Sequence, residues 1–299
     1  MSATLVISDV HANPWALDAV LDDAYARFSL SEIWFLGDLF GYGPEPYRVW
    51  NKLCKNPVLP LTQLVGNHDW GFIRRIEGPK MLNNIGDTGA WISHYRKQAS
   101  DVIALHQALL KSKKPVWSSF SSLPAMHSPR PGVYLVHGEV TDTPEKSIEH
   151  YTIHPLLTPD EMVSKFTGAS HAFPGDVILP DGHAEVPPLI FVCGHTHLQR
   201  LWRWDPVRAE WQSQTVDQPC NLRTLAGSPI LFNPGSVGFP RDGLGCPAYA
   251  VIDWDHEMLF FHHIWYDTTS LREAMAVEPY LGLISDPQFF IEPHCQENA

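Results

Sequence analysis

Five short apolar segments of the sequence are each followed, directly or after one glycine, by aspartate, asparagine or histidine. Near-continuous apolar runs of this length are typical of parallel strands that are buried on both faces. In LVGNHDW, Asn67, His68 and Asp69 follow such a run after Gly66, although a packed core has no use for side chains that are costly to bury. The five segments and the residues that end them are 4–8 with Asp9 and His11, 33–36 with Asp38, 63–65 with Asn67 and His68, 133–136 with His137, and 189–193 with His195 and His197.

Helices are predicted between the first of these strands. Asn13 is a favourable N-cap, Pro14 suits the first helical position, and apolar residues at helical spacing follow. Further helices are expected at about 46–54, 87–110 and 159–166. Strands that alternate with helices indicate an α/β fold with parallel strands.

The last third of the chain has a different pattern. Residues 201–204 and 211–216 predict an exposed hairpin, whose tryptophans 202, 204 and 211 we assign to sheet packing, with a partner surface as the alternative. Residues 231–232, 249–254 and 258–266 predict further, antiparallel strands, and 118–131 has the composition of a loop. We interpret 139–188, which is rich in proline, glycine and histidine, as an elaborated excursion, so residues 1–299 are expected to form a single domain.

Charge and cysteine content restrict the class of protein. The formal net charge of −12 argues against coating of nucleic acid, which usually needs a basic face, but leaves a small phosphorylated substrate open. The five cysteines are widely spaced without a CxxC pair, so neither a disulfide framework nor a thiolate zinc site is indicated. The first residues are too short an apolar run for a signal peptide, and no run approaches a membrane span, so a cytoplasmic location is expected.

The polar residues at the strand ends predict a metal site. Ligands of open α/β sheets bind at the carboxyl ends of the strands, so adjacent strands would bring these side chains to one rim. Carboxylates, an amide oxygen and imidazoles without thiolates favour Mn, Fe, Zn, Ni or Co. Because there are more candidate ligands than one ion needs, we expect two divalent metal ions bridged by one carboxylate.

The motifs resemble those of the calcineurin-like metallophosphoesterases. The resemblance rests on DVH at 9–11, GD at 37–38, GNHD at 66–69, HG at 137–138 and GHTH at 194–197, in the order of the family. GDLFGYGPEP and NPGSVGFPRDG extend it to about residue 243 and are similar to the bacterial and archaeal branch related to diadenosine tetraphosphatases and PP2A-type phosphatases. The implied fold is a four-layer α-β-β-α sandwich of two mixed sheets with the metals at the strand C-terminal ends.

The resemblance also implies a role for each matching residue. Asp9, His11 and His197 would hold one ion, Asn67, His137 and His195 the other, and Asp38 would bridge them. His68 would be the general acid that faces the leaving group, and Asp69 would orient His68 or its loop. Arg241 is a candidate for phosphate binding, since guanidinium suits bidentate oxyanion contacts, and Asn233 and Ser236 are expected to brace the site loops.

The implied activity is hydrolysis of a phosphomonoester, phosphodiester or nucleotide phosphoanhydride by a hydroxide that bridges the two metals. A small nucleotide-like substrate is preferred on family analogy, and the native metal and the oligomeric state stay open. The alternatives are a non-catalytic protein-interaction module on the same fold and a serine/threonine protein phosphatase. The protein phosphatase is the weaker alternative, because the arginine of the pattern GDxxxRG is absent here. Asp38 is followed instead by Leu39 to Gly43.

Other residues receive plainer interpretations. Tyr42 is assigned to loop packing, with substrate stacking as the alternative. The histidines outside the motifs are interpreted as solvated or structural, with a small chance that two of them, His171 and His183, line the mouth of the site; the others are His127, His150 and His154.

Overall fold

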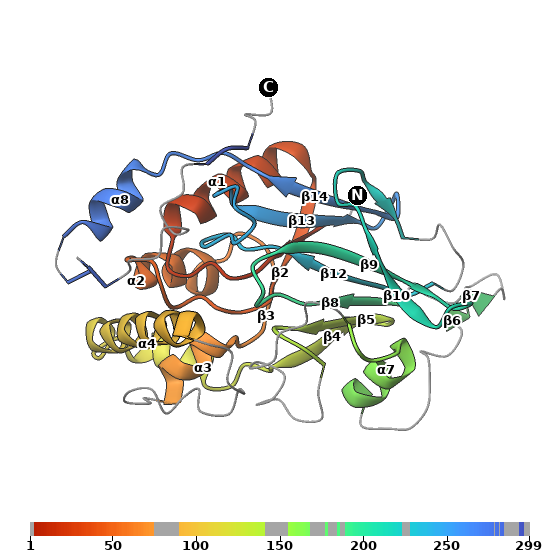
Figure 1. Ribbon diagram of the computed structural model, residues 1–299, viewed down its shortest axis with the longest axis horizontal. Helices are drawn as coiled ribbons and strands as arrows, with labels where there is room; N and C mark the ends of the chain where they lie inside the picture. The colour runs from red at the N-terminus through yellow and green to blue at the C-terminus, as the bar shows by residue number, and fades with distance from the viewer. Residues whose placement is uncertain are drawn as a thin grey trace.

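The computed structural model describes residues 3–74, 90–140, 155–167, 177–178, 184–185, 189–222, 228–277, 279–280, 282–283 and 293–295. Two six-stranded sheets pack face to face, and helices cover their outer faces (Figure 1). A two-stranded sheet of β6 (Val177–Ile178) and β7 (Ala184–Glu185) is separate from both.

The first sheet has the strand order β11-β14-β13-β1-β2-β3. The strands β1, β2 and β3 are parallel, whereas β13, β14 and β11 continue the sheet antiparallel. The sheet is therefore mixed, with its parallel half built from the first βα units. The bounds are β1 (Ala3–Ile7), β2 (Leu30–Phe35), β3 (Leu61–Gln63), β11 (Cys220–Asn221), β13 (Ala248–Asp253) and β14 (Met258–His263).

The second sheet has the order β10-β9-β12-β8-β5-β4 and is also mixed. Its central strands β5, β8 and β12 are parallel, and β4, β9 and β10 are antiparallel to their neighbours. The prediction of antiparallel strands at the end of the chain is thus wrong for one side of β12, which pairs parallel with β8. The bounds are β4 (Met126–Arg130), β5 (Val133–Val136), β8 (Ile190–Val192), β9 (Gln199–Asp205), β10 (Glu210–Gln214) and β12 (Ile230–Pro234).

Three apolar layers hold the sandwich together. Between the sheets, Val6 and Trp34 of the first sheet belong to one buried cluster with Val192 and Phe232 of the second. The outer face of the first sheet is covered by α1 (Pro14–Arg27), α2 (Pro46–Trp50) with the π-helical turn Asn51–Lys55, α3 (Asn67–Arg74), α4 (Ala90–Leu109), α5 (Lys114–Phe120) and α8 (Thr269–Met275). The outer face of the second sheet packs on α7 (Pro159–Thr167). The predicted four-layer α/β architecture is confirmed.

The first helix begins as the sequence predicts. The Asn13 side chain accepts a hydrogen bond from the N–H of Ala16, and Pro14 occupies the first turn. Leu17, Val20 and other apolar residues of the helix are buried against the sheet. Because the cap and the apolar stripe are local in sequence, they could be recognised without tertiary information.

Residues 118–131 differ from the prediction of a loop. The segment contains the end of α5 and the edge strand β4, which pairs with β5 through a register shift between His127 and Arg130. Pro129 lies in this strand, and proline is tolerated at a sheet edge, where no ladder hydrogen bond is needed from it.

Most of the predicted excursion at 139–188, with His150, His154, His171 and His183, lies outside the described residues. The indole-rich hairpin is β9–β10, and it is only partly exposed, because Trp202 is buried and Trp211 donates a hydrogen bond to the carbonyl of Leu157. This contact agrees with its assignment to sheet packing.

None of the helices in the described ranges has both the length and the apolar character that crossing a bilayer requires.

Candidate metal centre

The residues predicted as metal ligands meet where the parallel strands of both sheets end. The loops after β1, β2 and β3 supply Asp9 and His11, Asp38, and Asn67. The loops after β5 and β8 supply His137, and His195 with His197. Three groups of side chains have ligand atoms within 4.8 Å of one another, namely Asp9 with His11 and His197, Asp38 with His137 and His195, and Asp38 with His11 and His68. Asn67 joins them through its Oδ1, which lies 3.1 Å from Nε2 of His137.

The backbone at these positions is unusual. Five of the residues, namely Asp9, His11, Asp38, His195 and His197, have φ between 47° and 65°. Side chains other than glycine seldom adopt this left-handed region, and such conformations concentrate at functional sites. The chain thus accepts local strain in order to aim these side chains inward.

Three imidazoles point Nε2 toward the centre. His11, His137 and His197 each place Nδ1 at hydrogen-bond distance from a backbone carbonyl oxygen, of Phe40 at 2.8 Å, Leu36 at 2.9 Å and Phe239 at 2.5 Å. A carbonyl can only accept, so Nδ1 of each ring carries a proton and Nε2 faces inward. Holding a histidine through its other ring nitrogen is the usual way to orient a metal ligand.

The inward-facing atoms are mostly acceptors that confront one another. Nε2 of His11 lies 3.1 Å from Nε2 of His197, which lies 3.3 Å from Oδ1 of Asp9. Nε2 of His137 lies 3.3 Å from Oδ2 of Asp38. The two carboxylate oxygens are buried and accept no hydrogen bond within the described part of the chain. Unpaired buried acceptors are costly unless a cation lies between them, so this donor set fits metal ions.

The protonation of the imidazoles supports the same interpretation. Burial lowers the pKa of His11, His195 and His197 well below the usual histidine value, so these rings are neutral at pH 7 without losing a proton first. Burial acts in the same direction on His137, but the Asp38 carboxylate outweighs it and raises the pKa of His137 to about 9. A proton on His137 and a metal ion are therefore alternative ways of neutralising Asp38.

Asp69 ties two of the site loops together. Its Oδ2 accepts from the N–H groups of Asp38 and Gly66, and its Oδ1 accepts from those of Leu39 and Phe40. Burial raises the pKa of Asp69 to about 7, with the Asp38 charge adding to the shift, while the N–H donors favour the carboxylate. Asp69 thus contacts the backbone of both loops, and these contacts favour the loop-orienting role of the two that were predicted.

The bracing expected of Asn233 and Ser236 is visible in their contacts. Asn233 Nδ2 donates to the carbonyl of Gly194 and to the hydroxyl of Thr196, in the loop that carries His195 and His197. Ser236 Oγ donates to the carbonyl of Asp9. Both side chains therefore fix the backbone on either side of predicted ligands.

Sequence reasoning missed the part that Tyr42 and His106 play at this site. The Tyr42 ring packs on His11 and His68, with ring centroids 4.7 and 4.9 Å apart, and its hydroxyl accepts from Nη2 of Arg241 at 3.1 Å. His106 is buried in α4 and bonds the backbone of Gly41 and Gly43 on either side of Tyr42. The glycines that flank Tyr42 were a local signal of a special loop, whereas a single histidine on an amphipathic helix carries none.

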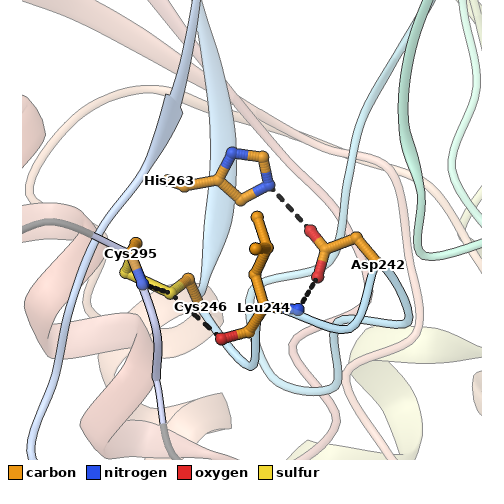
Figure 2. The surroundings of a disulfide bond; sticks show 5 residues. All are labelled: Asp242, Leu244, Cys246, His263 and Cys295. Carbon is orange, nitrogen blue, oxygen red and sulfur yellow. Dashed lines mark hydrogen bonds and ion pairs between the residues drawn. A yellow bond between two sulfur atoms is a disulfide. The ribbon is translucent and has the colours of Figure 1, made fainter.

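The loop after Arg241 is held by a disulfide that the sequence did not indicate. Cys246 is bonded to Cys295, 49 residues away, beside the contact of His263 Nε2 with Asp242 Oδ2 at 2.8 Å (Figure 2). The disulfide joins Cys295 to the segment between Arg241 and β13. A separation this long leaves no pattern in the sequence, which is why the cysteine spacing gave no sign of it.

Comparison with known proteins places the chain among phosphoesterases. The family model of calcineurin-like phosphoesterases matches residues 3–205. MJ0912, an uncharacterized protein of Methanocaldococcus jannaschii, is 26% identical over 276 residues, which are 92% of each chain.

Two solved structures share the fold. A metallophosphoesterase from Sphaerobacter thermophilus has a TM-score of 0.60 and 24% identity, covering 94% of this chain and 96% of that one. The hypothetical protein PH1004 from Pyrococcus horikoshii OT3 has a TM-score of 0.58 and 15% identity, covering 99% and 100%. Since the family match spans more than half of the 299 residues, the chain belongs to the calcineurin-like phosphoesterases, enzymes that hydrolyse phosphoesters with two divalent metal ions.

Proposed function

We propose that the protein hydrolyses a small, nucleotide-like phosphomonoester, phosphodiester or phosphoanhydride, with His68 as general acid. The observation that carries the proposal is the set of buried acceptors that face one another between the two sheets, beside an imidazole that is not among the predicted ligands. The nucleotide-like part rests on the resemblance of two loop segments alone, and manganese is one candidate among Mn, Fe, Zn, Ni and Co.

The geometry supports a division of the ligands between two ions. Asp9, His11 and His197 form one compact group. His137 and His195 form the second with Asp38, and Asn67 adds a neutral oxygen 3.1 Å from His137. Asp38 belongs to a group with His11 as well as to the group with His137, so it is the carboxylate that we assign to bridging.

Two divalent cations at this place would supply a nucleophile at neutral pH and neutralise the charge of the phosphoryl oxygens. The protein's own residues prepare the site for this. His11, His137 and His197 stay oriented by their Nδ1 contacts, and Asp69 holds the Asp38 loop against the Asn67 loop.

We assign to His68 the protonation of the leaving oxygen. Its backbone N–H donates to Oδ1 of Asp38 at 2.8 Å, and its ring packs against His11 and Tyr42 at the rim of the ligand groups. Burial lowers the pKa of His68, and Asp38 opposes this shift. The negative charge of a bound phosphate would act in the same direction as Asp38.

The test separates proton donation from the rest of the reaction. Protein loaded with each candidate metal is screened against mononucleotides, cyclic nucleotides, dinucleoside polyphosphates and nitrophenyl esters. His68→Ala should slow esters with basic leaving groups about 10²–10⁴-fold, but activated nitrophenyl esters much less, because only the former need a proton. His127→Ala, at an exposed position on β4, is the control and should keep both rates.

Two results would contradict the proposal. Equal loss on both kinds of ester in His68→Ala removes the general-acid role, and full metal occupancy in Asp38→Asn removes the bridging role. Metal-loaded protein that is inert towards every ester would instead favour a binding module on the same fold.

The compartment stays a prediction. The sequence favours the cytoplasm, whereas disulfides such as Cys246–Cys295 persist mainly in oxidising compartments. Trapping free thiols with an alkylating reagent at the moment of cell lysis distinguishes the two, because a cytoplasmic protein should carry the label on both cysteines.

A further inference from the structure

Tyr42 and Arg241 form a hydrogen-bonded pair at the edge of the candidate metal centre. The hydroxyl of Tyr42 accepts from Nη2 of Arg241 at 3.1 Å, although 199 residues separate them. The Tyr42 ring also packs on Phe239, with centroids 4.5 Å apart, and the Arg241 guanidinium lies 5.4 Å from the same ring. The phenylalanine thus supports both members of the pair.

The backbone of Tyr42 is fixed more tightly than packing of a surface loop requires. His106 accepts from the N–H of Gly41 at 3.4 Å and donates to the carbonyl of Gly43 at 2.9 Å, so one buried imidazole holds both flanks. Phe40, two residues earlier, stacks on Phe72 with centroids 3.8 Å apart. Tyr42 itself is 3% exposed and has φ of 52°. A tyrosine held in a left-handed conformation by this many contacts is pre-organised.

The charge of Arg241 acts on the site. Its backbone N–H donates to the carbonyl of His197. Its guanidinium donates to the hydroxyl of Tyr42, whose ring packs on His68 and His11. The guanidinium therefore lies within electrostatic reach of the proposed general acid and of a predicted metal ligand.

We propose that Tyr42 is a positioning residue which holds the Arg241 guanidinium toward the phosphoryl group, and that this pair favours phosphomonoesters over diesters. The inference rests on the proposed function and names its substrate class. A monoester has a second ionisation with a pKa of about 6, so at neutral pH it carries more charge than a diester and one more terminal oxygen. Guanidinium presents parallel N–H donors that suit two such oxygens. A diester has less negative charge and one terminal oxygen fewer, so the same guanidinium stabilises a bound diester less.

The experiment uses binding as well as turnover. Inorganic phosphate is titrated calorimetrically into manganese-loaded protein, and KM and kcat are measured for nitrophenyl phosphate and bis(nitrophenyl) phosphate. Arg241→Ala should weaken phosphate binding about 10- to 100-fold, and Tyr42→Phe about 3- to 10-fold, as expected for a charged contact and for one hydrogen bond that orients it. Both should raise KM for the monoester more than for the diester.

The double variant tests whether Tyr42 acts through Arg241. In Tyr42→Phe/Arg241→Ala, phosphate affinity should match that of Arg241→Ala within twofold, since the hydroxyl then has nothing to orient. Tyr249→Phe is the matched control: it removes a tyrosine hydroxyl that contacts Asp23 of α1, and it should leave phosphate affinity and both KM values unchanged.

Three outcomes would overturn the inference. They are unchanged phosphate affinity in Tyr42→Phe, an undiminished effect of Tyr42→Phe when Arg241 is already absent, and equal effects on monoester and diester. Loss of bound metal or a lowered Tm in Tyr42→Phe would also count against it, because it would show a structural role. If the protein hydrolysed no ester but phosphate binding followed the expected pattern, the positioning of Arg241 by Tyr42 would stand, whereas the monoester preference and the proposed function would fall.

Discussion

Acid should destabilise this protein partly through His106, which is buried and neutral. Burial lowers the pKa of His106 from 6.5 to about 3, while its contact with the Gly43 carbonyl opposes the shift. Between these two values the unfolded chain binds a proton that the native state does not. The contribution of His106 to the free energy of unfolding is therefore fully present above pH 6.5, and it is lost as the pH falls toward 3.

The size of the effect follows from the difference in proton binding. Between pH 7.5 and pH 5, one histidine that titrates only in the unfolded state costs about 2 kcal/mol, because pH 5 lies about 1.5 units below the unfolded value and each unit is about 1.4 kcal/mol. Since pH 5 is also far above the native value of about 3, the magnitude depends almost only on the unfolded chain.

The measurement is urea denaturation of metal-free protein at both pH values, for the native sequence and for His106→Gln. The glutamine can still donate to Gly43 but has no proton to gain, so its loss of unfolding free energy on acidification should be smaller by about 2 kcal/mol. His262, whose pKa burial lowers to about 4, titrates alike in both proteins and cancels. His127→Gln, at an exposed site, should retain the full loss. Equal losses in the native and His106→Gln proteins would refute the reasoning.

Three further predictions concern substitutions of single residues. Asn13→Ala should lower the free energy of unfolding by about 2–3 kcal/mol in chemical denaturation, because the cap to Ala16 and the bonds to Gly238 and Tyr266 are lost together. Unchanged stability would show that the cap contributes nothing here. Cys295→Ser should lower the free energy of unfolding by up to about 4 kcal/mol, the loop entropy expected for a disulfide that spans 49 residues. Cys54→Ser, at a cysteine outside any disulfide, should leave it unchanged. Gly41→Ala would place a methyl group 2.1 Å from Nδ1 of His68, so it should imitate His68→Ala on basic leaving groups. Gly243→Ala, which has positive φ but open space around it, should leave that rate unaffected.

The sequence predicted best what is local along the chain. Each candidate ligand lies within a few residues of the end of a strand, so its place at the rim follows from parallel pairing of neighbours such as β1 and β2. The cap at Asn13 lies three residues from its partner Ala16. Patterns of this kind contain all the information that their structure needs.

Contacts between distant segments could not be predicted in the same way. Tyr42 meets Arg241 only because the loops after β2 and β12 reach the same rim from different sheets, and Cys246 meets Cys295 only because the chain returns to β13. The edge strand β4 was missed because it contains proline and few strongly apolar residues, and its pairing with β5 decides its conformation.

Because both sheets supply ligands, activity can arise during folding only after the two sheets have packed together. Asp9 and His11 need His197 from the opposite sheet, and Asp38 needs His137 in the same way. A chain in which each sheet has formed separately holds an incomplete set of donors for each ion, so it should bind metal weakly and cleave nothing. Recovery of hydrolysis after dilution from denaturant should thus report the docking of one sheet onto the other.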